Sequence, residues 1–264
     1  MKMAPIVVLT YGFCGERRLR FLLERADHEV FCTKGTGIIP ACGAALRAWQ
    51  GAEGSSVTGE ASPLAVRSVR AMVDGMIAVI AARYGGRVWC ETATADPRTV
   101  ESFLTVVPET RVICLYRSCE DFVYTVLNDS PWGVDEPQFA ASVSAHPYSS
   151  VAAISSWWVA RSKSFLEFES KRQDRCFRVR FEDLALKEDS VAAMLSEWLD
   201  FPGKFGPAQG WTGDDSFSPT DRPPGCGAGF PVDQLPRVLA EEIDSIQLKL
   251  GYSPLLQVRS DLVR

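Results

Sequence analysis

The sequence has few of the residues that build metal and redox sites. Only 2 histidines occur in 264 residues, at positions 28 and 146. Its 8 cysteines are spread along the chain, and no two of them form a C-x-x-C pair. Because zinc sites need several Cys or His ligands at short spacings, this pattern predicts no metal site. We expect the cysteines to be reduced, as is usual in the cytoplasm.

Long apolar runs and excess positive charge are also lacking. No segment reaches the roughly 20 apolar residues that a membrane-spanning helix needs. The first residues do not have the pattern of a signal peptide. The formal net charge is −5, which disfavours a general nucleic-acid-binding surface. We therefore expect a cytoplasmic protein that binds neither nucleic acid nor membranes.

What the sequence does contain is a regular alternation of short apolar runs and amphipathic segments. The strand candidates cover residues 6–9, 28–32, 87–90, 111–116 and 176–180. The main helix candidates cover residues 16–26, 38–49, 63–84, 96–107, 120–127, 150–170, 190–200 and 235–250. Strands separated by helices predict an α/β fold, with a central parallel sheet of about four to five strands flanked by helices. We expect a single domain over residues 1–264.

The stretch of residues 5–23 is the most informative one. An apolar run, Ile6 to Leu9, leads into a short loop that contains Gly12 and Gly15, and a helix with one apolar face follows. Strand, glycine-containing loop and helix is the geometry that directs backbone N–H groups at an anion. Arginines in the first turns of this helix oppose the helix dipole, which a bound phosphate or sulfate would offset. The alternative is an ordinary turn beside a solvated basic face.

In a parallel sheet, ligands bind at the carboxyl ends of the strands. That edge should gather residues 11–15, 91–96 and 116–119 and the segment after residue 180. Arg117 ends the most apolar strand candidate, and an arginine buried there needs an anion. The anion is either a bound phosphate or a structural carboxylate such as Asp121.

Four stretches, taken in order, resemble the sulfotransferase family that uses 3′-phosphoadenosine 5′-phosphosulfate (PAPS). They are TYGFCGERRL at residues 10–19, RVICLYRSCEDFVYTVL at 111–127, VRFEDL at 179–184, and a glycine-bearing loop near 225–229 with LGY at 250–252. Together with the first strand, they span residues 5–252. The resemblance implies a P-loop-like α/β fold and PAPS, or its product adenosine 3′,5′-bisphosphate (PAP), as the cofactor.

The resemblance also implies a set of cofactor-binding residues. The loop would hold the 5′-phosphosulfate through Gly12, Phe13, Cys14, Gly15, Glu16, Arg17 and Arg18. Arg117 and Thr125 would bind the 3′-phosphate, although the Thr125 hydroxyl can instead bond to its own helix backbone. Arg222, in the C-terminal loop, would bind a cofactor phosphate or be an exposed loop residue.

The loop departs from the family pattern in three places. Phe13 stands where the family has a basic residue, and Glu16 and Arg17 stand where it has two threonines. A carboxylate in near contact with a phosphosulfate is unfavourable by roughly 1 kcal/mol even in water. Either Arg17 or Arg18 restores the positive charge, or the loop has lost its donor. The later stretch Glu91-Thr92-Ala93 also lacks the Lys that the family often has.

The resemblance implies transfer of a sulfuryl group from PAPS to a hydroxyl or amine of a small-molecule acceptor, in natural-product biosynthesis. The sulfate is either retained or used as a leaving group. We expect Arg17 to stabilise the transferred group and Glu91, or else His146, to be the general base. Glu91 could instead pair with an arginine of the first helix, and His146 could be a solvated loop residue.

The alternative hypothesis is a catalytically altered subunit that keeps the fold and binds a partner chain in a hetero-oligomer. A homodimer is also compatible with the sequence. The sequence lacks G-x-x-x-x-G-K-[ST], which argues against a P-loop kinase.

Overall fold

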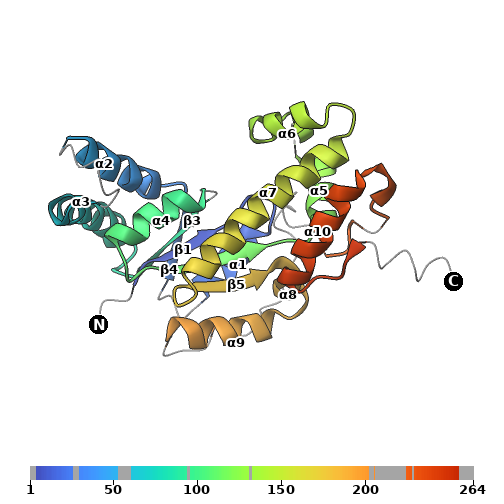
Figure 1. The fold of residues 1–264 in the computed structure, drawn as a ribbon. Helices are drawn as coiled ribbons and strands as arrows, with labels where there is room; N and C mark the ends of the chain where they lie inside the picture. The colour runs from blue at the N-terminus through green and yellow to red at the C-terminus, as the bar shows by residue number, and fades with distance from the viewer. Residues whose placement is uncertain are drawn as a thin grey trace.

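The fold is built on a sheet of five parallel strands (Figure 1). The structure is a computed structural model that describes residues 4–25, 30–52, 61–93, 96–130, 133–201, 205, 224–227 and 229–255. The strand order is β2-β3-β1-β4-β5, and every pairing is parallel. The strands are β1 (Ile6–Leu9), β2 (Val30–Lys34), β3 (Val88–Ala93), β4 (Arg111–Tyr116) and β5 (Cys176–Arg180). The predicted α/β fold with a parallel central sheet is confirmed.

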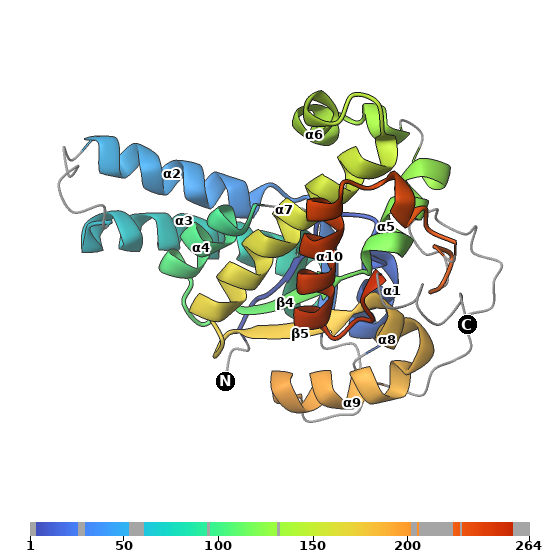
Figure 2. The ribbon, with the colours of Figure 1, turned by 45° about the vertical axis from the view of Figure 1, so that its right-hand side comes forward.

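Helices connect the strands and cover both faces of the sheet. They are α1 (Glu16–Glu24), α2 (Ile38–Ala52), α3 (Pro63–Ala82), α4 (Pro97–Val106), α5 (Cys119–Asp129), α6 (Ala140–Ala145), α7 (Ser150–Lys171), α8 (Phe181–Leu186), α9 (Glu188–Leu199) and α10 (Arg237–Leu250). Helices α7 and α10 lie on one side of the sheet and α9 lies on the other (Figure 2). Within the described ranges, no helix combines the length and the apolarity needed to cross a membrane.

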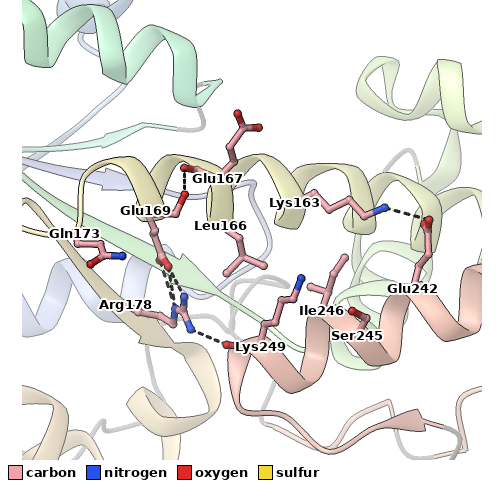
Figure 3. Close-up of a pocket in the computed structure, with 11 residues that line it drawn as sticks. Lys163, Leu166, Glu167, Glu169, Gln173, Arg178, Glu242, Ser245, Ile246 and Lys249 are labelled. Carbon is pink, nitrogen blue, oxygen red and sulfur yellow. Dashed lines mark hydrogen bonds and ion pairs between the residues drawn. The ribbon is translucent and has the colours of Figure 1, made fainter.

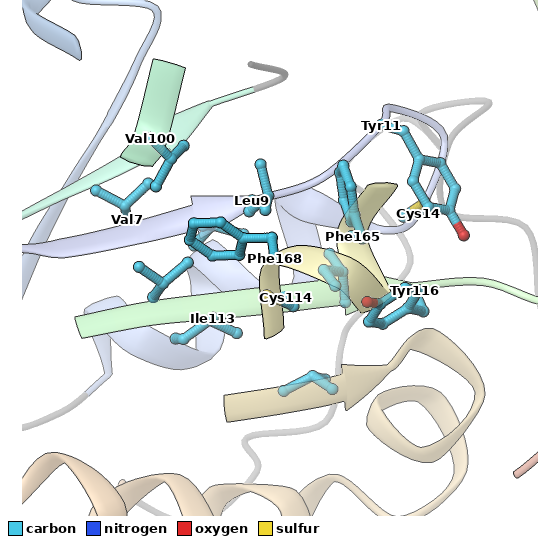
Figure 4. Close-up of a cluster of buried hydrophobic side chains, with 14 of the residues drawn as sticks. Val7, Leu9, Tyr11, Cys14, Val100, Ile113, Cys114, Tyr116, Phe165 and Phe168 are labelled. Atoms are coloured by element: carbon cyan, nitrogen blue, oxygen red, sulfur yellow. The ribbon is translucent and has the colours of Figure 1, made fainter. Parts of the chain in front are cut away.

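The core lies where the two central strands meet α7. All four residues of β1 are buried, as are five of the six residues of β4. On one face of the sheet, Val7 lies beside Val100 of α4, and Leu9 lies beside Phe168 of α7 (Figure 4). Strands that are buried on both faces have continuous apolar sequences, which is why these two were readable from the sequence.

Side chains at the helix starts fix where several helices begin. The Ser62 hydroxyl accepts a hydrogen bond from the Ala65 N–H, and Pro63 occupies the first turn of α3. The Asp96 carboxylate accepts one from the Arg98 N–H at the start of α4. These contacts satisfy N–H groups that have no partner within the helix. The predicted starts of α3 and α4 are therefore confirmed.

The segment between α5 and α7 is more regular than its sequence suggests. Residues 128–149 are rich in Pro, Ser and Asp and have no periodicity, which is typical of a long loop, but they contain the 3₁₀ turns η1 (Gly133–Asp135) and η2 (Pro137–Phe139) and then α6. Phe139 is fully buried, and its ring centroid lies 5.0 Å from that of Trp157. One aromatic anchor can hold such short elements, and a single anchor leaves no periodic pattern in the sequence.

Candidate functional site

The loop that follows β1 has an unusual backbone. Gly12, Phe13 and Gly15 all have positive φ angles, of 84°, 55° and 81°. Tight turns of this kind can direct successive backbone N–H groups into a concavity that binds an anion. A side chain built on Gly12 would have nothing within 4 Å, so the loop is open at that point. Phe13 adopts this conformation although the left-handed region costs a non-glycine residue roughly 1–2 kcal/mol.

The acidic residue of the loop is held by the loop itself. Glu16 is the first residue of α1, and its Oε1 accepts a hydrogen bond of 2.6 Å from the Thr10 hydroxyl. The Thr10 oxygen in turn accepts one of 3.3 Å from the Gly12 N–H. A carboxylate at a helix N-terminus also interacts favourably with the helix dipole. These contacts give Glu16 a local role that explains why a carboxylate is tolerated there.

A cavity of about 650 Å³ opens beside this loop. The loop contributes Thr10 to Phe13, and the neighbouring strands contribute Lys34 and Thr92. The remaining lining residues are Glu16, Arg17, Arg20, Glu136, Pro137 and Gln138. The structure thus brings together four of the predicted residues: Gly12, Phe13, Glu16 and Arg17. It adds Arg20, one of the arginines that the sequence places in the first turns of α1, and two charged residues that the sequence did not single out: Lys34 and Glu136.

The other predicted residues of this loop face away from the cavity. Arg18 Nε and Nη2 donate hydrogen bonds of 3.3 and 3.2 Å to Glu188, and Nη2 donates another, of 3.2 Å, to the Ala185 carbonyl. The Arg18 guanidinium thus joins α1 to the α8–α9 junction and does not line the cavity. Cys14 and Gly15 are buried, and burial raises the pKa of the Cys14 thiol well above its usual value.

Arg117 follows β4 at the expected edge of the sheet, but its side chain is 0% exposed. Its Nη1 donates a hydrogen bond of 2.9 Å to the Phe13 carbonyl. Its guanidinium carbon lies 4.6 Å from the centroid of the Phe181 ring. The arginine therefore braces the loop after β1 from beneath, and a bound phosphate could reach it only after a rearrangement.

The predicted partners of Arg117 are engaged elsewhere. The Asp121 carboxylate accepts hydrogen bonds of 2.8 and 2.7 Å from the N–H groups of Gly225 and Gly227. The Thr125 hydroxyl, 0% exposed, donates a bond of 2.8 Å to the Asp121 carbonyl in its own helix. Thr125 thus makes the bond to its own helix backbone that the sequence also allows. Arg222 lies outside the described residues.

The two proposed general bases lie outside the cavity. Strand β3 continues to Ala93, so Glu91 lies within the strand rather than after it. The Glu91 carboxylate is 3% exposed and accepts hydrogen bonds from the Thr33 hydroxyl (2.6 Å) and from the Thr36 N–H and hydroxyl (both 2.9 Å). Its partners are thus two threonines, and it fixes the turn after β2. His146 is the half-buried residue that ends α6.

Neither predicted base lines the cavity, whereas two other carboxylates do: Glu16 and Glu136. The Glu136 carboxylate accepts hydrogen bonds from the Ser130 hydroxyl and, at 3.0 Å, from the Gln138 amide. No pattern in the sequence places Glu136 near β1, because it belongs to a segment more than a hundred residues further along the chain.

A cluster of three carboxylates lies at the start of α5. Glu182 accepts hydrogen bonds from the Ser118 N–H (2.9 Å) and from the Tyr252 hydroxyl (2.8 Å). Burial, more than the nearby carboxylates of Asp121 and Glu182, raises the pKa of Glu120 from 4.5 to about 7. Glu120 Oε2 is buried and has no hydrogen-bond partner among the described residues. Glu120 is therefore easiest to accommodate when it is protonated.

This cluster predicts a pH-dependent stability. An acid whose pKa is higher in the folded state stabilises the protein below its unfolded pKa, and this stability is lost as the pH rises through the folded value. The free energy of unfolding should therefore fall by on the order of 3 kcal/mol between pH 4.5 and 7.5 on account of Glu120. The Glu120→Gln variant should not show this decrease in urea titrations across that range. A variant with the same decrease as the wild type would contradict the assignment.

A second cavity, of about 900 Å³, lies between α7 and α10 (Figure 3). Its charged side chains largely pair with one another: Arg178 pairs with Glu169, and Lys163 pairs with Glu242 at 3.1 Å. None of its lining residues belongs to the loops that follow the carboxyl ends of β1, β3 or β4. The cavity beside the loop of residues 10–15 is therefore the better candidate site. In the part of the chain that the structure describes, no group of three or more His, Cys, Asp or Glu residues is placed to hold a metal ion.

No protein-family model matches the chain, and no curated protein matches it in sequence. Solved structures do match it. A sulfotransferase domain from the curacin biosynthetic pathway superimposes with a TM-score of 0.62 at 15% identity, over 95% of this chain and 98% of the other. The sulfotransferase domain of the Synechococcus PCC 7002 olefin synthase gives a TM-score of 0.55 at 14% identity, over 95% and 96% of the two chains. An Alicyclobacillus acidocaldarius sulfotransferase gives 0.50 at 12% identity, over 96% and 98%. The chain therefore has the α/β fold of bacterial sulfotransferases.

Proposed function

We propose that this protein transfers a sulfuryl group from PAPS to a hydroxyl or amine of a small-molecule acceptor. The observation that carries the proposal is the loop of residues 10–15, where left-handed backbone at the end of β1 opens onto a cavity of about 650 Å³. Two of the structures with this fold come from biosynthetic enzymes, which supports an acceptor from natural-product biosynthesis. A retained sulfate and a sulfate that later leaves are both compatible with the same transfer.

The residues of the loop suit the 5′ end of this cofactor. PAPS supplies an activated sulfuryl group whose transfer, like phosphoryl transfer, depends on positioning and on charge stabilisation. The backbone N–H groups that follow Gly12 in the loop would hold its phosphosulfate oxygens, and Arg17 would balance their charge. Glu16 and Glu136 are the carboxylates that can accept the proton of the acceptor. The aromatic wall formed by Tyr11 and Phe13 would limit access of water.

The 3′-phosphate of the cofactor does not fit the observed arrangement of Arg117 and Thr125. Arg117 and Thr125 have no exposed surface, and Cys226 of the loop at residues 224–227 lies 3.7 Å from Arg117 Nη2. That loop must move before a 3′-phosphate can reach the arginine. The burial of Arg117 favours the second candidate function, a catalytically altered subunit of the same fold that binds a partner chain.

Calorimetric titration with PAP separates the two functions. We expect the wild-type protein to bind PAP and Arg17→Gln to bind it about tenfold more weakly, because a charge-assisted hydrogen bond is worth roughly 1.4 kcal/mol. Arg83→Gln, an exposed arginine at the end of α3, is the matched control and should bind as the wild type does. A folded wild-type protein that does not bind PAP would overturn the proposed transfer and leave the altered subunit.

A further inference from the structure

We propose that Arg20 and Lys34 bind an anionic group of the acceptor. The acceptor would then be a hydroxy or amino compound that also carries a carboxylate or phosphate, held at a distance from the group that receives the sulfuryl. This inference rests on the proposed function for the identity of the ligand. The existence of an anion site depends only on the positions and contacts of Arg20 and Lys34.

Arg20 brings a second guanidinium to the cavity. It lies one helical turn after Arg17 and lines the same cavity. Its Nε is buried and makes no hydrogen bond with any of the residues described, so an anion in the cavity would be bound by the two terminal nitrogens of the guanidinium.

Lys34 reaches the same cavity from the end of β2. It is the last residue of β2, where it pairs with Thr92 of β3, and Thr92 in turn pairs with Val8 of β1. Neighbouring strands are about 4.8 Å apart, so the Lys34 backbone lies roughly 10 Å across the sheet from β1. Glu91, bonded to both threonines beside Lys34, holds this strand end in place.

The three positively charged residues of the cavity therefore form two separate positions, one at Arg17 and one at Arg20 and Lys34. Arg17 stands at the first turn of α1, beside the loop that would hold the phosphosulfate. Arg20 stands one turn further along α1, which packs against β2, and the Cys32 thiol of β2 lies 3.9 Å from the Arg20 carbonyl. Arg20 and Lys34 can thus share one ligand group that is distinct from the group at the loop.

The carboxylates of the cavity do not occupy this second position. Glu16 is bonded to Thr10, and Glu136 is bonded to Ser130 and Gln138. The ion pairs within the described residues include neither Arg20 nor Lys34. A carboxylate or phosphate is the ligand group that an arginine fork and a lysine bind most strongly.

The test measures anion binding in the presence of saturating PAP, with inorganic phosphate and acetate as the probes. We expect the wild type to bind at least one of them, and Arg20→Gln and Lys34→Met each to weaken that binding about tenfold. Arg83→Gln is the control and should leave it unchanged. Tighter binding of phosphate identifies a phosphorylated acceptor, and tighter binding of acetate identifies a carboxylic acid.

The outcomes separate this site from the proposed function. If the wild type does not bind PAP, the same titrations are made without it. A loss of phosphate or acetate binding that is confined to the Arg20 and Lys34 variants still supports the anion site. Equal binding by the wild type and both variants would overturn the proposal. So would the absence of binding of both probes, or phosphate binding that PAP abolishes, because the anion would then occupy the loop.

Discussion

Gly15→Ala should lower the free energy of unfolding by about 3 kcal/mol, because two costs add at this position. Gly15 has a φ of 81°, and a left-handed conformation costs an L-residue roughly 1–2 kcal/mol. An added Cβ would also lie 2.1 Å from Cδ2 of the Phe181 ring, and such overpacking costs roughly 1–3 kcal/mol. Urea denaturation of the two proteins measures the sum.

Gly12→Ala is the matched control, in the same loop. Its φ is 84°, but an added Cβ would have nothing within 4 Å. The free energy of unfolding of this variant should therefore fall only by the cost of the left-handed backbone, roughly 1–2 kcal/mol. Adding Phe181→Leu to Gly15→Ala should recover part of the larger loss, since it makes room for the methyl group. Equal losses in Gly12→Ala and Gly15→Ala would show that the contact with Phe181 is unimportant.

The contact between Gly15 and Phe181 also shows what the sequence could and could not predict. The apolar strands at residues 6–9 and 111–116 were readable because both faces of a central parallel strand are buried. Likewise, Leu19, Leu22 and Leu23 revealed the buried face of α1. Nothing in the sequence indicates that residue 15 packs on residue 181, because such contacts depend on the order of the strands.

The residues of the candidate site likewise fall into two groups: those that one stretch of sequence indicates, and those that only the fold brings to the cavity. The residues of the loop after β1 are local in the sequence, so their glycines and Arg17 could be proposed from one stretch. Lys34 and Glu136 reach the cavity only because β2 lies two strands from β1 and because η2 closes the other side. Arg18 could not be separated from Arg17 without knowing that Glu188 lies beside it.

The carboxyl end of β3 was misjudged for a related reason. The predicted strand stopped at residue 90, since Glu91 and Thr92 are polar and mimic the start of a loop. In the structure, a polar residue is accommodated at position 91 because the Glu91 carboxylate accepts hydrogen bonds from the threonines of the neighbouring strand and turn. A polar residue that is satisfied within a sheet looks, in a single sequence, the same as a catalytic residue at its edge.

Arg117→Ala should destabilise the protein by about 3–5 kcal/mol in the absence of any ligand. The Phe13 carbonyl would lose the donor that now lies 2.9 Å away, and a void would open against the Phe181 ring. Arg111→Ala, at the other end of the same strand, is the control. Arg111 pairs at 2.6 Å with Asp200, whose side chain is 79% exposed, so its loss should cost at most about 1 kcal/mol.

Comparing stability with PAP affinity then assigns the role of Arg117. If the arginine is mainly a brace for the loop after β1, Arg117→Ala is destabilised without ligand, and a milder change such as Arg117→Lys should lower stability and PAP affinity together. An arginine reserved for a 3′-phosphate would give the opposite result: PAP binding lost and stability unchanged. That result would mean that the loop at residues 224–227 leaves Arg117 exposed in solution, since an arginine buried against Phe181 cannot be removed without cost. The stability measurement therefore tests the closed arrangement directly, whichever reaction the protein performs.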